Sequence, residues 1–372
     1  MTPPAKILVR GVNWLGDAVM TTPALLRLRE HFRDSQITIL SPEKLGALYL
    51  DHPAIDRVLM FSKEDGVIGL AKWLRDERFD LAVVLPNSPR TALEAFLGRV
   101  TQRVGYARPW RNWMLTQRVA DRPNIVRMHK RTPAEVRARI ASGASRETFP
   151  ASSHHVNHYL HLVGAIGCNP APLAPLLHVR DDEVVEFSKR FKMGSKTQPL
   201  FALNPGAEYG PAKRWPEERF VDAALKLHQR TNCTWLILGG RGDRELAKRI
   251  TAQLSQHLGP QSVGNIAGET SLRELCAGLK RCDLLLTNDT GPMHVAAAVG
   301  TPVVVPFGST SPELTGPGLP GRDAHQLLLG QSPCSPCFLR ECPVEFQCMK
   351  DIGVDRVVEA ALKLVRKSTT PA

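Results

Sequence analysis

The sequence predicts an α/β protein with two Rossmann-like domains whose parallel sheets face each other across a cleft. Apolar strand patterns without alternation are followed by helical patterns, as expected for parallel strands that are covered on both faces. This succession runs twice along the chain, starting at Lys6 and again at Leu200. The 372 residues suffice for two domains with cores of ordinary size.

The first half of the chain begins with a buried strand, KILVRGV, a turn, NWLGD, and a long helix with a proline near its start. Strands are expected at 6–12, 36–40, 54–61, 80–85 and 103–106, and helices at 18–32, 67–77, 154–166 and 181–191. We assign 1–191 to an N-terminal Rossmann-like domain and 192–199 to a linker.

The second half repeats the alternation more regularly. Strands are expected at 201–206, 233–240, 263–267, 283–287 and 303–307, and helices at 215–230, 243–258, 271–282, 292–299 and 355–366. We assign 200–350 to a C-terminal Rossmann-like domain and 351–372 to a helix that packs back toward the domain junction.

Composition indicates a globular protein with an acidic partner, since 43% of residues are hydrophobic, 23% are charged and the formal net charge is +12. The chain goes almost directly into a strand pattern, and Gly and Pro interrupt its longest apolar runs. We therefore expect a cytoplasmic protein without a signal peptide or a membrane span. Its eight cysteines are then expected to be reduced unless they hold a metal.

The segment Arg99–Arg139 holds eleven Lys and Arg residues against two acids, with Trp110 and Trp113 among them. The tryptophans can stack on nucleobases, touch a membrane interface or pack half-buried beneath a solvated basic face. The following residues are rich in Ser, and the stretch Lys130–Ser153 is expected to be an excursion of the chain.

Three turns that follow strands suit a nucleoside diphosphate. Thr290, Gly291 and Pro292 begin a helix, whose N–H groups and dipole attract phosphate. The stretch NPGAEYGPAKRWP delivers Lys213 and Arg214 after a strand, and a Gly-rich turn follows at 239–242. The alternative for each is an ordinary solvated turn.

Other candidates keep two interpretations. Asp17 can act as a general base, or it can simply cap the helix that we expect from Ala18. The spacing of Cys334, Cys337, Cys342 and Cys348 permits a zinc site, although reduced packing cysteines are favoured. The histidines of HHVNHYLH are expected on a partly exposed helix face: His154, His155, His158 and His161.

Three stretches together resemble a known family: GVNWLGDAVMTTPAL (11–25), NPGAEYGPAKRWP (204–216) and NDTGPMHVAAAVGTPVVVPFGSTSPELTGP (288–317). They are similar to the ADP-heptose:lipopolysaccharide heptosyltransferases, the glycosyltransferase family 9 enzymes with the GT-B fold. The resemblance covers essentially the full chain in matching order. It is closest to the heptosyltransferase II branch, and the excursion looks longer than the family pattern.

The resemblance implies inverting transfer of a heptose from ADP-heptose onto the heptose of the Kdo–lipid A core, with the acceptor bound by the N-terminal domain (1–191) and ADP-heptose by the C-terminal domain (200–350). Asp17 matches the family's general base, and Lys213 matches the lysine that stabilises the departing ADP. The donor-binding residues are then Lys213, Arg214, Gly239, Gly268, Thr270, Leu272, Asp289, Thr290, Gly291 and His294. For the acceptor we expect Asn13, Trp14, Arg108 and Arg111, the arginines because the acceptor is anionic.

The resemblance implies no essential metal or cofactor, since Lys213 and a helix start can take a metal's role. The expected partners are the lipid A–Kdo–heptose acceptor and the anionic inner face of the inner membrane, without nucleic acid. The alternatives are another core linkage or nucleotide sugar, a sugar-nucleotide epimerase, a non-catalytic sensor, and a nucleic-acid-binding protein that uses Arg99–Arg139.

Overall fold

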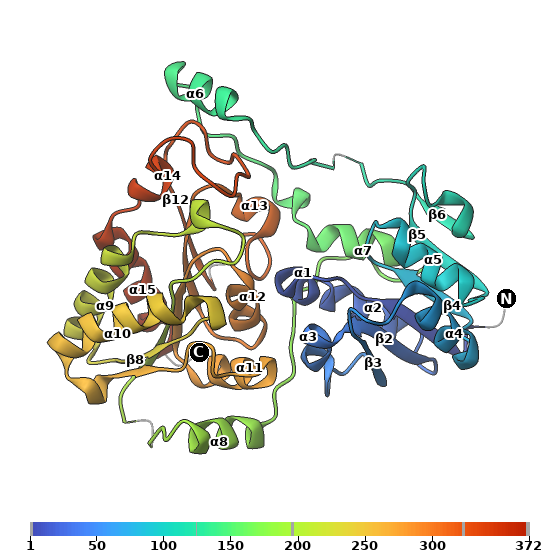
Figure 1. Cartoon of the computed structure of the whole chain (residues 1–372), viewed down its shortest axis with the longest axis horizontal. Helices are drawn as coiled ribbons and strands as arrows, with labels where there is room; N and C mark the ends of the chain where they lie inside the picture. The colour runs from blue at the N-terminus through green and yellow to red at the C-terminus, as the bar shows by residue number, and fades with distance from the viewer. Residues whose placement is uncertain (1–2, 124, 195–196, 322–323, 370–372) are drawn as a thin grey trace. The chain divides into compact units, whose positions relative to one another are not determined.

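The computed structural model describes residues 3–123, 125–194, 197–321 and 324–369, the last three of these by their backbone only. The chain forms two compact units (Figure 1). Unit 1 comprises Met1–Ile125 and His155–His178, and unit 2 comprises Val126–His154 and Val179–Ala372. Each unit contains one six-stranded sheet in which every strand pair is parallel.

The sheet of unit 1 has the order β3-β2-β1-β4-β5-β6, which places β1 in the interior between β2 and β4. Its strands are β1 (Lys6–Arg10), β2 (Gln36–Pro42), β3 (Arg57–Phe61), β4 (Leu81–Val84), β5 (Gln102–Tyr106) and β6 (Gln117–Val119). The helices are α1 (Leu15–Met20), α2 (Thr22–His31), α3 (Glu43–Gly46), α4 (Val67–Glu77), α5 (Pro89–Leu97) and α7 (Val156–Gly164). Short 3₁₀ turns lie at η1 (Ala47–Tyr49) and η2 (Asn112–Met114).

The sheet of unit 2 has the order β12-β11-β10-β7-β8-β9. Its strands are β7 (Leu200–Asn204), β8 (Thr234–Ile237), β9 (Val263–Asn265), β10 (Leu284–Thr287), β11 (Val303–Phe307) and β12 (Gln326–Leu329). The helices are α6 (Pro133–Ala141), α8 (Asp181–Arg190), α9 (Glu217–Thr231), α10 (Arg244–Leu258), α11 (Leu272–Arg281), α12 (Gly291–Ala298), α13 (Pro312–Thr315), α14 (Gln347–Lys350) and α15 (Val354–Thr369). Further 3₁₀ turns are η3 (Ala151–Ser153), η4 (Pro211–Lys213), η5 (Arg241–Asp243) and η6 (Pro260–Ser262).

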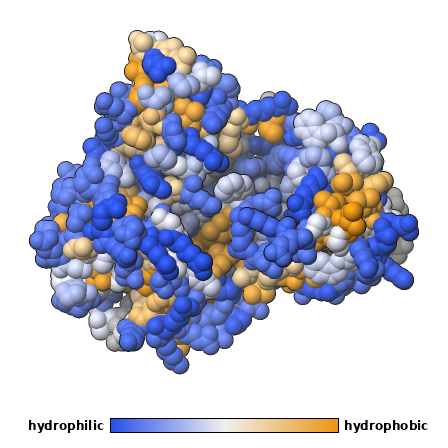
Figure 2. All heavy atoms as spheres, viewed as in Figure 1, coloured by the Kyte–Doolittle hydropathy of each residue, from blue (hydrophilic) through white to orange (hydrophobic). Residues whose placement is uncertain are grey.

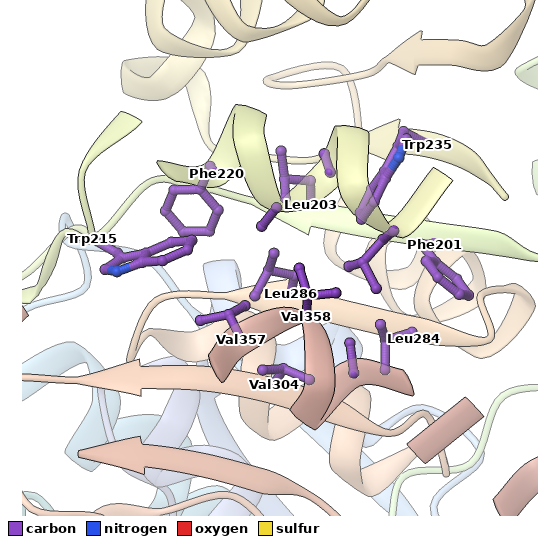
Figure 3. Close-up of a cluster of buried hydrophobic side chains, with 14 of the residues drawn as sticks. Phe201, Leu203, Trp215, Phe220, Trp235, Leu284, Leu286, Val304, Val357 and Val358 are labelled. Carbon is purple, nitrogen blue, oxygen red and sulfur yellow. The ribbon is translucent and has the colours of Figure 1, made fainter. Parts of the chain in front are cut away.

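The core of unit 2 lies between its sheet and the helices α9, α10 and α15. Figure 3 shows Val357 and Val358 of α15 packed against Leu286 of the sheet, within a cluster whose side chains are buried. Trp215, which precedes α9, meets Phe220 edge-on at 5.1 Å between ring centroids. This packing fixes the chain that leads from Lys213 into α9, because burial of such large rings dominates core energetics.

The predicted α/β class with two parallel sheets is confirmed, and the strands that precede the candidate sites lie where we expected them. The helix predicted over 18–32 is two helices, because α1 begins at Leu15 and ends before Thr21, and α2 begins with Pro23 in its first turn. The helix α6 and the strands β6 and β12 were not predicted. A capping box, in which Thr132 and Glu135 bond each other's backbone, marks the start of α6.

The two units divide the chain differently from the expected boundary at 191. The residues Val126–His154 and the helix α8 belong to unit 2. Arg273 of α11 forms an ion pair with Glu183 of α8, and Arg139 of α6 donates to the carbonyl oxygen of Pro333. The last helix, α15, packs within unit 2 against α9 and the strands β10, β11 and β12.

Candidate active-site residues

Asp17 lies in the first turn of α1, directly after the loop that follows β1. The N-cap residue of α1 is Trp14, and no side chain caps the helix. Asp17 is therefore not the N-cap that one interpretation of the sequence required. Carboxylates in the first turn are favoured by the helix dipole, and the carboxyl edge of a parallel sheet is where such folds bind ligands.

The Asp17 carboxylate faces an imidazole. Its Oδ1 lies 3.7 Å from Nδ1 of His155, and about a third of each side chain is exposed, 29% for Asp17 and 30% for His155. Burial lowers the pKa of His155, although Asp17 opposes that shift. A neutral imidazole beside a carboxylate can accept a proton without first losing one.

The charge of Asp17 also acts on two buried tyrosines, Tyr49 and Tyr159. Burial, and to a smaller extent the Asp17 charge, raises the pKa of Tyr49 to about 12 and that of Tyr159 well above its usual value. The ring of Tyr159 stacks on His155 at 5.1 Å. The charge of Asp17 therefore acts on two phenols and on an imidazole whose pKa burial lowers, and a carboxylate in this position can take up a proton.

The expected acceptor residues fall into two groups. Asn13 and Trp14 are exposed in the loop before α1, and Lys44 Nζ lies 5.7 Å from the Trp14 ring. Arg108 forms an ion pair with Asp121 at 2.9 Å and remains partly exposed. These three remain candidates for contacts with an acceptor.

Arg111 is different, because it is fully buried. Its guanidinium donates to the carbonyl oxygen of Pro86, at the end of β4, and burial lowers its pKa to about 10. The prediction that Arg111 contacts an acceptor conflicts with this position, since the side chain has no exposed surface. It instead ties the loop after β5 to the end of β4.

In unit 2, Lys213 and Asp289 form a tight ion pair. Lys213 ends the turn η4, and its Nζ lies 2.6 Å from Oδ2 of Asp289, with side-chain exposures of 14% and 4%. Thr310, in the turn after β11, donates its hydroxyl to the same Asp289 oxygen. Lys213 Nζ also lies 4.9 Å from the ring of Tyr209, a cation–π distance.

The helix α12 begins just after Asp289 in the sequence, at the turn where we expected a helix start. Thr290 is its N-cap residue, Pro292 lies in its first turn, and His294 is buried. The Thr290 hydroxyl makes no capping bond. First-turn N–H groups have no acceptor within their own helix, so this helix start suits a phosphate oxygen.

Two of the expected donor-binding residues, Gly239 and Gly268, lie just after the carboxyl ends of β8 and β9. The N–H of Gly268 donates to the carbonyl oxygen of Gly239 at 2.9 Å, and Thr270 and Leu272 follow half-buried. A Cβ on Gly206 would lie 2.3 Å from the Asp243 carboxyl carbon, so a larger residue there would have to displace the Asp243 side chain. Arg214 is exposed beside this turn.

The histidine and cysteine expectations have different outcomes. The partly exposed histidine face is wrong for His154 and His158, which are buried, the latter stacked on Tyr106 at 3.9 Å. Cys334, Cys337 and Cys348 are also buried, and burial raises the pKa values of Cys337 and Cys348. In the part of the chain that the structure describes, no group of three or more His, Cys, Asp or Glu side chains is arranged to hold a metal ion.

Sequence reasoning missed three contacting residues: His155, Tyr209 and Thr310. Tyr209 stands inside the quoted stretch NPGAEYGPAKRWP, so its place four residues before Lys213 was visible. Thr310 follows β11 as Asp289 follows β10, and neighbouring parallel strands end at one edge. His155 gave no signal, because 138 residues separate it from Asp17.

Comparisons with known proteins show the family of the chain. Residues 134–347 match the model of glycosyltransferase family 9 (heptosyltransferase), and the chain belongs to this family. Lipopolysaccharide heptosyltransferase 2 of Salmonella typhimurium is 29% identical over 320 residues, which cover 84% of this chain and 85% of that protein. Lipopolysaccharide heptosyltransferase 1 of Pseudomonas aeruginosa is 25% identical over 352 residues, which cover 91% and 87%.

A solved structure supports the fold assignment. The structure of E. coli ADP-heptose lps heptosyltransferase II matches with a TM-score of 0.77 at 26% identity, covering 98% of this chain and all of that one. The two parallel sheets therefore belong to a GT-B glycosyltransferase. Among the described residues, no helix is both long enough and apolar enough to cross a membrane.

Proposed function

We propose that this glycosyltransferase moves L-glycero-D-manno-heptose from ADP-heptose onto the heptose already attached to Kdo–lipid A in the lipopolysaccharide core. Relatives named heptosyltransferase 2, at 29% identity over 84% of the chain, support this choice of linkage. The observation that carries the proposal is the buried Lys213–Asp289 pair, which comes from the loops that bear the phosphate-binding signatures.

Asp17 is the proposed general base. Its carboxylate takes the proton from the attacking acceptor hydroxyl, whose oxygen then bonds the anomeric carbon of the heptose. The bond from that carbon to the diphosphate oxygen breaks, and ADP leaves with the electron pair. A single displacement of this kind inverts the anomeric centre.

Lys213 and the start of α12 are the proposed seat of the diphosphate. Negative charge grows on the leaving oxygen as the sugar bond breaks, and preset cations and N–H dipoles lower the barrier by holding it. Asp289 would release part of its hold on the Lys213 ammonium when the diphosphate arrives, and it would then lie near the heptose hydroxyls. These groups supply the charge that a metal would otherwise supply, so we propose that no metal is essential.

A transfer assay tests the linkage. Purified protein is incubated with ADP-heptose and one of two acceptors, Kdo–lipid A that carries one heptose or Kdo–lipid A alone. The products are identified by mass spectrometry. We expect heptose addition only to the heptose-bearing acceptor. Addition to Kdo–lipid A alone would indicate the first linkage instead, and conversion of ADP-heptose without any acceptor would indicate an epimerase.

We also propose that unit 1 meets the anionic membrane that holds the acceptor. Trp110 and Trp113 are 58% and 62% exposed, and Trp113 meets the ring of Phe96 edge-on at 5.2 Å. Figure 2 shows apolar residues gathered over α5, where Leu93 and Phe96 are only partly buried. We call Leu93, Phe96, Trp110 and Trp113 the tryptophan face.

Basic side chains border the tryptophan face. Arg103 lies 5.5 Å from the centre of the Phe96 ring, and Arg99 is exposed just after α5. Tryptophan favours the headgroup region of a bilayer, and arginine favours an anionic surface. A nucleic-acid partner has less support, because the basic segment divides between the two units and Arg111 within it is buried.

A further inference from the structure

The excursion segment, which we define as residues 130–153, contacts the loop of unit 2 that contains Cys334 and Cys337. The N–H of Arg131 donates to the carbonyl oxygen of Cys337 at 3.0 Å, and its Nε donates to that of Pro336 at 2.9 Å. Val136 of α6 is buried in a cluster with Cys334, Cys337 and Leu339. The segment is thus a packed part of unit 2.

That loop, the cysteine-rich loop (residues 332–342), supports both halves of the Lys213–Asp289 site. On the Asp289 side, the N–H groups of Cys337 and Phe338 donate to the carbonyl oxygen of Ser309, at 3.1 and 2.7 Å. On the Lys213 side, the Tyr209 hydroxyl donates to the carbonyl oxygen of Phe338 at 2.8 Å. The N–H of Ala212 donates to the carbonyl oxygen of Arg340 at 2.9 Å.

A direct ion pair also joins the excursion segment to the turn that follows β11. Arg146 donates from both terminal nitrogens to the carboxylate of Glu313, at 3.2 and 3.1 Å, with side-chain exposures of 9% and 24%. A bidentate ion pair of this kind fixes the relative orientation of the two side chains as well as their distance. The Ser311 hydroxyl donates to the same carboxylate.

Glu313 remains charged in this setting. Burial raises its pKa, but the hydrogen bonds from Arg146 and Ser311 outweigh burial and hold the pKa below its usual value. Removal of Arg146 would leave a half-buried carboxylate without its cation, which is costly. The residue next to Ser311 is Thr310, whose hydroxyl donates to Asp289.

From these contacts we infer that the excursion segment is a positioning element of the donor site, and that Arg146 is its positioning residue. Arg146 acts through Glu313 and Ser311 on the turn that carries Thr310, and Thr310 orients the Asp289 carboxylate that holds Lys213. This inference rests on the proposed function for its kinetic consequences, but the contacts themselves do not depend on it.

The expected effect follows from how strongly catalysis depends on position. A displacement of about 1 Å in a positioned group costs up to about 10²-fold in rate. We expect the R146Q variant to lose about tenfold in kcat for heptose transfer, while the acceptor KM stays within about twofold. If the excursion segment only stabilised the fold, R146Q would lower the melting temperature and leave kcat of the folded enzyme unchanged.

The matched control is E135Q, which weakens the capping box of α6 in the same segment. Glu135 bonds Thr132 and His129 and has no contact with the turn after β11. We expect E135Q to keep kcat within about twofold of the wild type and to lower the melting temperature by no more than R146Q does, because glutamine also completes a capping box. Equal kcat losses in the two variants would overturn the inference.

A charge swap provides the rescue. R146E and E313R each place like charges together, and we expect each alone to lose more activity than R146Q. The double variant R146E/E313R restores an ion pair, and we expect it to recover most of the lost kcat. Should R146Q fail to fold, R146K keeps the cation without the two-pronged geometry, and wild-type kcat in R146K would contradict the inference.

Calorimetric binding of ADP separates this inference from the proposed function. If the wild type transfers no heptose, the proposed function fails, and ADP affinity then tests the positioning role alone. We expect R146Q to weaken ADP binding about threefold or more, since the Lys213 position is disturbed, and E135Q to leave it unchanged. An unchanged ADP affinity in R146Q together with wild-type kcat would refute the positioning role.

Discussion

Asp17 in unit 1 and Lys213 in unit 2 both follow the carboxyl ends of central strands, but their surroundings differ. Asp17 is about a third exposed, and the nearest His155 nitrogen lies 3.7 Å away, beyond hydrogen-bond range. Lys213 is nearly buried, and its ammonium lies 2.6 Å from Asp289, which also accepts a bond from Thr310.

This difference fits the two tasks that we propose. A general base must reach a substrate hydroxyl and later give up the proton, so a half-exposed carboxylate beside neutral side chains suits it. A group that stabilises a leaving diphosphate works best when it is already in place, because no reorganisation is then needed during the reaction. The dense contacts around Lys213 provide that prior order.

The strongest test of the ordered side is K213Q. The loss of one preset group that holds leaving-group charge typically costs about 10²- to 10³-fold in kcat, and we expect that range. Steady-state kinetics with saturating acceptor measures it. K226Q is the matched control, since Lys226 forms an exposed pair with Asp355 and should leave kcat unchanged; wild-type kcat in K213Q would remove Lys213 from the mechanism.

The second test concerns acid stability, which should differ between the units. Burial lowers the pKa of His52 to about 4 and that of His158 to about 3 in unit 1, and that of His325 to about 4 in unit 2. Each lowered pKa means that the unfolded state binds the proton first. Stability is therefore complete above about pH 6.5 and falls as the pH drops from there toward the folded values, by about 1.4 kcal/mol per pH unit for each histidine.

Urea denaturation between pH 6.5 and 4 measures this loss. H158F keeps an aromatic ring against Tyr106. We expect it to reduce the pH dependence of the unfolding free energy by the contribution of one histidine. H129F is the control, since His129 is exposed and pairs only with Glu135 among the ion pairs of the described residues. A wild-type pH dependence in H158F would show that His158 does not titrate as its burial requires.

The smallest expected effect is on membrane binding by unit 1. Each arginine near an anionic surface contributes about 1 kcal/mol, so R99Q should weaken binding to vesicles rich in anionic lipid about fivefold. Loss of both side chains in W110Q/W113Q should weaken it further and also reduce binding to neutral vesicles. R230Q, on an exposed position of α9, should bind like the wild type; wild-type affinity in W110Q/W113Q would exclude the tryptophan face.

The sequence predicted the fold, and the turns that we propose to hold the diphosphate, because their signals are local. The apolar run VVVPF forms the buried strand β11, and Thr290, Gly291 and Pro292 form a helix start from three adjacent residues. The pairing of Lys213 with Asp289 could be expected in outline, since both loops end neighbouring strands, β7 and β10. The geometry of this ion pair could not be predicted, because it also depends on Thr310, which follows a third strand, β11.

The errors arose where distant contacts decide. In the sequence, Arg111 is one of several arginines in a basic segment. In the structure, it is buried and donates to the carbonyl oxygen of Pro86, 25 residues earlier, a contact that the local sequence does not reveal. His158 was assigned to an exposed face because helical spacing alone does not reveal Tyr106 above it. The role of the excursion segment was equally hidden, since its Arg146 meets Glu313 across 167 residues.

The central claim is that Asp17 of unit 1 performs the proton transfer for a donor that unit 2 binds, and D17N tests it most directly. Heptose transfer and ADP binding are measured on the same protein, beside the wild type. We predict that kcat falls about 10²-fold or more while ADP affinity stays within about twofold, since the donor site is untouched. Near-normal turnover in D17N would contradict the account.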